Sequence, residues 1–231
     1  PTTGNINEII CIGYSPKDGS CPADNTLVSF ILSTSRNNLN NPVSPTSGNK
    51  FTLGIEQFIS IGNNSPTFNR MRAAYSFFIP TKLINLTKEC RSKDATNEEC
   101  SQTFGFQFKA GTILGELPPY ESFCMGGSSS VRGWGACDLS VSKSFVEATA
   151  EYRFPLWRMI SGSLFADVGT DMGSQKDVPG KPGKLLKKAG SGFSLGAGVG
   201  VKTPIGPLRL DIASKDLSGE MRYTLGVGWK F

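Results

Sequence analysis

The feature that most constrains the fold is a strict two-residue alternation between positions 222 and 231. Apolar or aromatic residues fill every second position of this segment, and polar or small residues fill the positions between them. The apolar set is Tyr223, Leu225, Val227, Trp229 and Phe231, and the other set is Arg222, Thr224, Gly226, Gly228 and Lys230. A helix would mix both sets on every side, whereas a strand separates them onto two faces. The segment is therefore predicted to be a strand with one apolar and one polar face.

The same alternation recurs along the chain, with turn residues between the repeats. About ten strands are predicted in this way, at residues 6–14, 26–36, 50–61, 68–80, 102–114, 143–154, 160–168, 191–203, 207–214 and 220–231. A soluble β-sandwich alternates too, but its inner faces pack on each other and rarely carry so many aromatic residues on every strand. We therefore favour an all-β, antiparallel transmembrane β-barrel, with the apolar face toward lipid and the polar face toward the lumen. A β-sandwich is the alternative on pattern alone.

The hydropathy of the chain excludes a helical membrane protein but not a barrel. Mean hydropathy is −0.16, and no apolar run approaches the roughly 18 residues that a membrane-spanning helix needs. Barrel strands face the lumen on one side, so their average hydropathy is intermediate. The 27 glycines and 15 phenylalanines suit strands, tight turns and aromatic girdles better than helices. No signal peptide begins at Pro1, so the chain is expected to be a mature product or an excised fragment.

Loop lengths predict the sidedness, because outer-membrane barrels have short periplasmic turns and long outer loops. The turns interpreted as periplasmic lie at residues 38–49, 155–159 and 203–206. The long stretches interpreted as external lie at residues 15–25, 115–142 and 169–190. A long segment at 81–101 falls on the periplasmic side and is interpreted as an inserted hairpin.

Each neighbouring pair of the six cysteines encloses a short polar stretch. The pairs are Cys11 with Cys21, Cys90 with Cys100, and Cys124 with Cys137. We interpret them as three local disulfides, which require an oxidising compartment. Six free thiols are the alternative, because spacing alone does not select a pairing.

Charge and motifs argue against an enzyme and against a nucleic-acid-binding protein. The net charge is +5, but the lysines and arginines are spread along the chain, so nucleic acid is not an expected partner. The absence of histidine excludes a Ser-His-Asp site and makes a zinc site unexpected. The basic run at 181–188 is predicted to be a solvated external loop, with contact to anionic headgroups or polysaccharide as the alternative. We predict no covalent chemistry, no cofactor and no metal.

Three motifs carry a family resemblance. They are Val131-Arg132-Gly133-Trp134, Glu151-Tyr152-Arg153-Phe154-Pro155 and Leu164-Phe165-Ala166-Asp167-Val168-Gly169. Together with the turn at 40–48 and the segment at 206–211, they resemble in order and spacing the family of outer-membrane protein insertases and related transporters. That family includes the bacterial barrel-assembly protein BamA, the two-partner secretion transporters and the chloroplast protein-import channel. The resemblance spans residues 36–231 and is closest to cyanobacterial or plastid members.

The resemblance implies a barrel of about sixteen strands, preceded by periplasmic POTRA domains. This chain shows about ten strands and no POTRA domain. Residues 1–231 are therefore expected to be the C-terminal portion of the barrel, and a truncated paralogue is the alternative. The implied location is an outer membrane of the Gram-negative or cyanobacterial type, or the plastid outer envelope.

The resemblance also implies that a long loop, here about residues 115–142, folds back into the barrel, where its arginine pairs with acids of two later motifs. Arg132 would then be partly removed from water, where a guanidinium stays charged and needs carboxylates. Glu151 and Asp167 have the strand parity that faces the lumen, and Gly133 would let the chain turn tightly beside them. The predicted loop site comprises Val131, Arg132, Gly133, Trp134, Glu151 and Asp167. Without the resemblance, an exposed Arg132 in a flexible loop would be preferred.

The function that the resemblance implies is the insertion or translocation of polypeptides. An open strand edge can template a new strand, and glycines weaken a strand. The last strand, with Gly226, Gly228, Trp229 and Phe231, is therefore predicted to be a lateral seam. The expected partners are membrane lipid, unfolded outer-membrane or preprotein clients, and accessory assembly proteins or POTRA domains. A passive pore or structural barrel is one alternative, and a two-partner secretion transporter is another.

Overall fold

The computed structural model describes residues 26–61, 67–84, 90, 100–203 and 206–231. Within these ranges, nine strands form one sheet in which neighbours in the sheet are also neighbours in the order of the chain. They are β1 (Thr26–Asn37), β2 (Gly48–Ile61), β3 (Phe68–Thr81), β4 (Gln102–Gly115), β7 (Ser144–Trp157), β8 (Ile160–Thr170), β9 (Ser191–Val201), β10 (Leu208–Lys215) and β11 (Met221–Val227). A separate two-stranded ribbon pairs β5 (Phe123–Met125) with β6 (Ser140–Ser142). The connections also hold the short helices η3 (Pro119–Glu121), η4 (Ser174–Asp177) and α2 (Pro182–Leu185).

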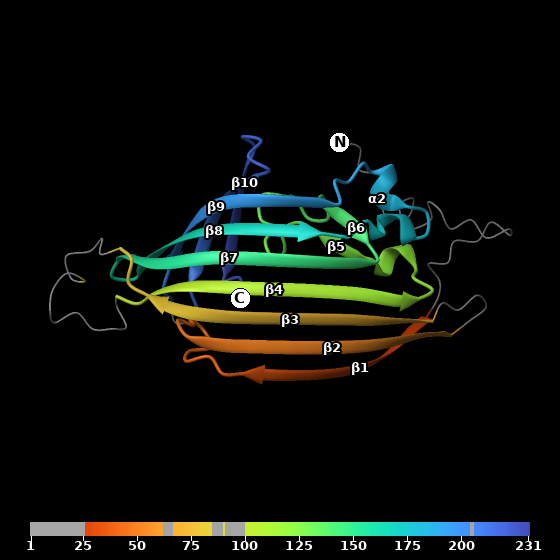
Figure 1. Ribbon diagram of the computed structural model, residues 1–231, viewed down its shortest axis with the longest axis horizontal. Helices are drawn as coiled ribbons and strands as arrows, with labels where there is room; N and C mark the ends of the chain where they lie inside the picture. Colours follow the sequence, from red (N-terminus) through yellow and green to blue (C-terminus); the bar gives the residue numbers. More distant parts are fainter. Residues whose placement is uncertain (1–25, 62–66, 85–89, 91–99, 204–205) are drawn as a thin grey trace.

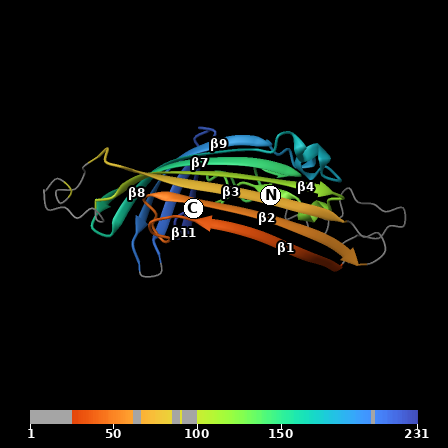
Figure 2. The ribbon, with the colours of Figure 1, turned by 60° about the horizontal axis from the view of Figure 1, so that its bottom comes forward.

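The nine-stranded sheet is antiparallel and curls into an arch (Figure 1, Figure 2). Its two edges are β1 and β11, which do not pair with each other in the described part of the chain. Each of these nine strands confirms a predicted strand, and the predicted strand at 6–14 lies outside the described residues. The sequence does not predict β5 and β6, because three residues are too few to show an alternation.

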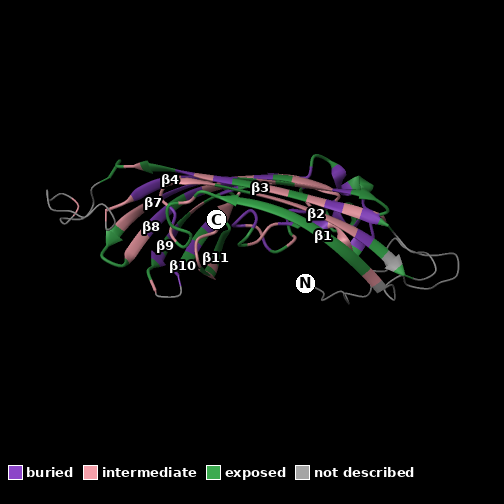
Figure 3. Cartoon of the chain, turned by 90° about the horizontal axis from the view of Figure 1, so that it is seen from below, coloured by how far each residue is buried: buried purple, intermediate pink, exposed green. Residues whose placement is uncertain are grey.

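The arch is polar on its concave face and apolar on its convex face. The polar side chains buried on the concave side include Arg70, Gln107, Glu147, Thr149, Glu151, Arg153, Asp167, Arg209 and Asp211. The large apolar side chains exposed on the convex side include Ile59, Tyr75, Ile79, Phe108, Leu164, Val199, Leu210 and Leu225. Figure 3 shows the resulting alternation of buried and exposed positions along the strands. An exposed apolar surface that crosses the whole sheet exceeds the patches of a water-soluble monomer, so this face is expected to meet lipid.

The connections between strands gather at two opposite ends of the arch (Figure 1). The connections that follow β1, β3, β7 and β9 lie at one end, and those that follow β4 and β8 lie at the other. This arrangement agrees with the sides to which the sequence assigned the turns and the long loops. Which end faces the periplasm stays a prediction. Among the described residues, no helix combines the length and the apolar character needed to cross a membrane.

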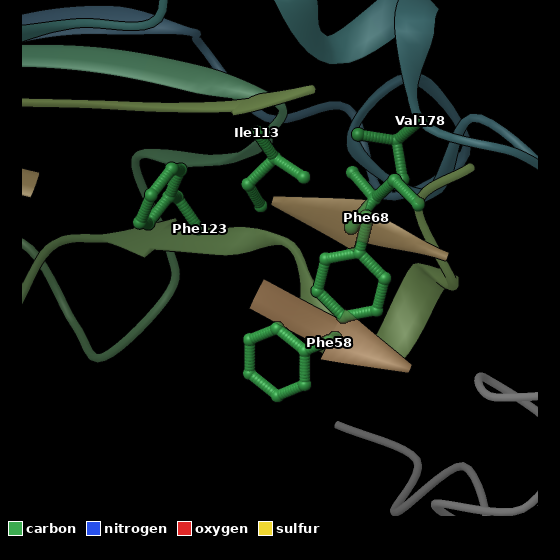
Figure 4. Packing of buried hydrophobic residues seen from close by; sticks show 6 residues of the cluster. Phe58, Phe68, Ile113, Phe123 and Val178 are labelled. Carbon is green, nitrogen blue, oxygen red and sulfur yellow. The ribbon is translucent and has the colours of Figure 1, made fainter. Parts of the chain in front are cut away.

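An apolar core lies at one end of the concave face, where loops cover the sheet. The rings of Phe58 and Phe68 stack with their centroids 4.3 Å apart. Ile113 and Phe123 join them, and Val178 of the connection between β8 and β9 packs from above (Figure 4). Full burial of one such side chain contributes roughly 1.5–3 kcal/mol. This core therefore fastens the long loops to the inner wall of the sheet.

The end of the chain differs from the prediction. The alternation predicts a strand over 220–231 with Trp229 and Phe231 toward lipid, but β11 ends at Val227. Gly228 has a φ of 83°, which residues with a side chain rarely adopt, and there the chain turns toward the concave face. The ring of Trp229 lies 4.4 Å from Arg153 Cζ, and the Phe231 ring stacks on Phe78. The lipid-facing assignment of these two aromatic residues is therefore wrong, because the strand ends at Val227 and the turn at Gly228 carries all of the following residues to the concave side.

Two of the three predicted disulfides are present in the described residues, Cys90–Cys100 and Cys124–Cys137. Cys11 and Cys21 lie outside those residues, so their pairing stays a prediction. We expect non-reducing peptide mapping to recover all three neighbouring pairs, each of which stabilises the fold by about 2–4 kcal/mol. Free thiols at Cys11 and Cys21, found together with the other two intact pairs, would contradict this expectation.

Candidate functional site: a loop held against the inner wall

The connection between β4 and β7 folds back over the concave face of the sheet. Near its start, Glu121 forms an ion pair with Arg70 of β3. Farther along, Met125, Val131 and Leu139 form a second buried cluster, against which Trp134 and Phe145 pack. The disulfide Cys124–Cys137 closes this part of the connection. The connection is therefore a packed element with its own apolar core, and it holds its tip at a fixed place.

Arg132 lies at that tip and is only 1% exposed. Its Nη1 is 2.8 Å from Glu151 Oε2, and its Nε is 2.8 Å from Asp167 Oδ2. The Arg132 backbone N–H also donates to Asp167 Oδ2 at 3.0 Å, and Nη2 donates to Asp167 Oδ1 at 3.1 Å. Asp167 thus accepts hydrogen bonds from Nε and Nη2 of the guanidinium, and Glu151 accepts one from Nη1. The structure therefore brings together Arg132, Glu151 and Asp167, the three charged residues that were predicted from the sequence to pair.

A third carboxylate completes the surroundings of the guanidinium. Asp211 of β10 has its Oδ2 3.4 Å from Arg132 Nη1 and 2.9 Å from Arg209 Nε. Sequence reasoning missed this partner, although the inward parity of Asp211 on the predicted strand 207–214 was a usable signal. We call Arg132, Glu151, Asp167 and Asp211 the loop site.

The electrostatics of the loop site keep Arg132 charged. Burial by itself would lower the pKa of the guanidinium, because a low-dielectric environment disfavours the charged form. The hydrogen bond with Asp167 and the negative charges of Glu151, Asp167 and Asp211 outweigh burial and raise the pKa of Arg132 above its usual value. A permanent cation cannot exchange protons with a substrate, so the arrangement is suited to holding the loop.

The guanidinium also stacks on an aromatic ring. Arg132 Cζ lies 3.3 Å from the centroid of the Phe165 ring, a geometry that attracts a cation to the ring face. Gly196 of β9 lies against the same ring, and a Cβ added there would overlap the Phe165 ring and the carbonyl oxygen of Ile212. The missing side chain at position 196 therefore makes room for the ring that supports Arg132.

The neighbours of Arg132 in its motif dock the tip onto the wall. Val131 is completely buried in the second cluster. Gly133 has a φ of 91°, and a Cβ at this position would lie 3.1 Å from the backbone nitrogen of Lys215. Trp134 Nε1 donates to the carbonyl oxygen of Phe193 at 3.2 Å. Each residue of Val131-Arg132-Gly133-Trp134 thus has a separate contact that fixes the tip.

The predicted seam residues do not belong to the loop site. Gly226 lies on β11, whereas Trp229 and Phe231 lie beyond it on the concave side. Lys230, which sequence reasoning did not single out, does reach the site, because its Nζ is 3.0 Å from Asp167 Oδ1. The alternation placed Lys230 on the lumen side but gave no indication of this contact. In the described ranges, no group of three or more His, Cys, Asp or Glu side chains is placed to hold a metal ion.

Comparison with known sequences identifies the family. Residues 4–231 match the profile described as the Omp85 superfamily domain. The chain belongs to the Omp85 superfamily. Two of its relatives in Arabidopsis thaliana are 41% identical to it: Outer envelope protein 39, chloroplastic, over 163 residues, and Outer envelope protein 80, chloroplastic, over 125 residues. Protein TOC75-4, chloroplastic, from the same plant is 34% identical over 152 residues. These names agree with the predicted outer-envelope location.

This Omp85 chain corresponds to part of each relative. The matched region covers 71% of the chain but 40% of Outer envelope protein 39, 54% of the chain but 17% of Outer envelope protein 80, and 66% of the chain but 36% of TOC75-4. The crystal structure of BamA from Haemophilus ducreyi lacking POTRA domains 1-3 superposes with a TM-score of 0.59 at 16% identity. That match covers 85% of this chain and 40% of the BamA chain. It confirms the predicted fold, and the family match confirms the predicted resemblance.

The close packing at Gly196 in this Omp85 chain gives a specific prediction. Gly196→Ala is expected to destabilise the folded protein by about 1–3 kcal/mol, the usual effect of overpacking, because the new Cβ displaces Phe165. Gly54→Ala is the matched control, since a Cβ added at that inward-facing strand position meets nothing within 4 Å. Urea unfolding in lipid vesicles would measure both variants. Equal stability of the two would show that Phe165 does not depend on the space at position 196.

Proposed function

We propose that this chain is the C-terminal portion of an outer-membrane barrel that inserts polypeptides into the membrane or moves them across it. The observation that carries the proposal is the buried Arg132, which ties a long loop to three carboxylates on the inner wall. A loop fixed by ion pairs occupies the lumen but can be released without breaking a covalent bond. A buried guanidinium must be paired, and its partners lie on β7, β8 and β10, so these ion pairs hold the loop against the sheet.

The two edges of the arch support a role in strand pairing. β11 has 7 residues, whereas β3, β4 and β7 have 14 each. Its pairing with β10 stops at the partners Leu208 and Val227, directly before the turn at Gly228. Among the described residues β11 has no partner on its outer side, and an incoming strand can add to such an open edge by main-chain hydrogen bonds. We propose that a client strand pairs at β11 and leaves the seam toward lipid.

The partners follow from the two faces and from the length of the relatives. The apolar convex face would contact membrane lipid, and the polar lumen would contact unfolded outer-membrane proteins or preproteins. POTRA domains of the full-length protein, or accessory assembly proteins, would deliver those clients. Because the work consists of strand exchange and loop release, we propose that no covalent catalysis takes part.

The test is an insertion assay with the complete protein in lipid vesicles. An unfolded client barrel is added, and its acquisition of protease resistance is followed over time. Insertion should be faster than in empty vesicles, and Arg132→Ala should slow it while Arg36→Ala, at an exposed position of β1, should not. Ion conductance without any gain in insertion over empty vesicles would favour a passive pore instead.

A further inference from the structure

The last residues of the chain form a tail that is fastened inside the arch at three points. Trp229 Nε1 donates to Ser44 Oγ at 3.2 Å, in the connection between β1 and β2. Phe231 accepts a hydrogen bond from Arg153 Nη2 at its carbonyl oxygen, at 3.2 Å. Between them, Lys230 points to the loop. We call residues 228–231 the inner tail.

Lys230 contacts both the loop and the wall that holds it. Its Nζ donates to the carbonyl oxygen of Ser130, two residues before Arg132. The same Nζ donates to Thr149 Oγ1 at 2.9 Å and to Asp167 Oδ1 at 3.0 Å. The Lys230 side chain is 2% exposed. A lysine buried to this extent, with all three protons directed at oxygens, is held by specific contacts.

Asp167 therefore carries two cations from different segments. Its Oδ1 accepts from Arg132, Thr149 and Lys230, and its Oδ2 accepts from Arg132 alone among the described residues. Two cations on one carboxylate repel each other, but Arg132 also forms ion pairs with Glu151 and Asp211, which offset part of this repulsion. Lys230 in addition holds the loop backbone directly at Ser130. The inner tail and the loop therefore meet directly at Ser130 and share Asp167.

We propose that Lys230 is a positioning residue of the loop site that couples the inner tail to the loop, so that each segment holds the other in place. This inference rests on the proposed function for its biological meaning, because the tail continues the seam strand β11. Departure of the tail from the lumen would remove one of the contacts that hold the loop. Opening at the seam and release of the loop would then favour each other.

Such coupling is reciprocal, because a coupling free energy acts equally in both directions. The test is amide hydrogen exchange on the complete protein in lipid vesicles, followed in a loop peptide (residues 126–135) and a tail peptide (residues 221–231). Lys230→Met should speed exchange in the tail peptide and should also speed exchange in the loop peptide, the latter by between about 5-fold and 150-fold. Lys202→Met is the matched control, since Lys202 is an exposed lysine at the end of β9, and it should change neither peptide.

Two further measurements separate coupling from general loosening. Amides of β2 and β3 far from the tail should keep their wild-type exchange rates in Lys230→Met. Lys230→Arg keeps the charge and should restore part of the loop protection, which also covers the case in which Lys230→Met fails to fold. The proposal is overturned if Lys230→Met frees the tail while the loop peptide exchanges as in the wild type. Because exchange is measured without any client, failure of the insertion assay would refute the proposed function and leave the coupling intact.

Discussion

Arg132→Ala is expected to release the loop from the inner wall while the sheet stays folded. Removal of one partner of a buried ion pair typically costs about 3–5 kcal/mol, because the opposite charges remain buried without compensation. Here the variant leaves Glu151, Asp167 and Asp211 facing one another at the place that the guanidinium filled. Amide exchange in residues 126–139 should therefore rise strongly, and client insertion should fall more than the yield of folded barrel.

The conservative replacement separates charge from geometry. Arg132→Lys keeps the positive charge but cannot present two parallel N–H groups to Asp167, as Arg132 does through Nε and Nη2. It should restore loop protection only in part. Arg36→Ala, at an exposed position on β1, should match the wild type in both assays. Full loop protection in Arg132→Ala would mean that the apolar cluster around Met125, Val131 and Leu139 holds the loop by itself.

Leu32→Arg is expected to be far more damaging than Ser33→Arg, although the two residues are neighbours on the same strand. Leu32 pairs with Ile55 on the convex face and is 74% exposed, and Ser33 pairs with Gly54 on the concave face and is also exposed. An arginine on the lipid face near the membrane midplane costs about 2–4 kcal/mol, whereas a position on the lumen face is wet. A Cβ added at Gly54 meets nothing within 4 Å, so the lumen beside Ser33 has room for an arginine.

Folding yield in lipid vesicles measures the difference directly. Since both side chains are exposed in the folded chain, only the lipid environment separates them. Equal yields in vesicles would show that the convex face of β1 does not face the membrane.

The alternation of side chains could be predicted from the sequence because it is a local property. Each residue of a strand points away from its neighbours, so the faces of β3, β4 and β7 follow from their own segments without knowledge of the rest. The inward parity of Glu151 and Asp167 has the same origin. A buried arginine needs carboxylates to compensate its charge. This requirement, together with the family motif, was enough to predict that Arg132 pairs with Glu151 and Asp167.

The sequence by itself thus determined the nine strands of the sheet, the two faces of these strands up to Val227, and the inward-facing residues available to the loop site. The tertiary structure alone decided which inward-facing groups meet, because the curl of the sheet brings distant segments to one point. Asp211 lies 79 residues from Arg132 in the chain, and Lys230 lies 63 residues from Asp167. The turn at Gly228 also depends on the tertiary structure. In the sequence the alternation continues to Phe231, but in the folded chain Trp229, Lys230 and Phe231 make contacts inside the arch, and the strand ends before them. Local periodicity contains no information on such contacts, since they exist only once the wall, the loop and the tail have assembled.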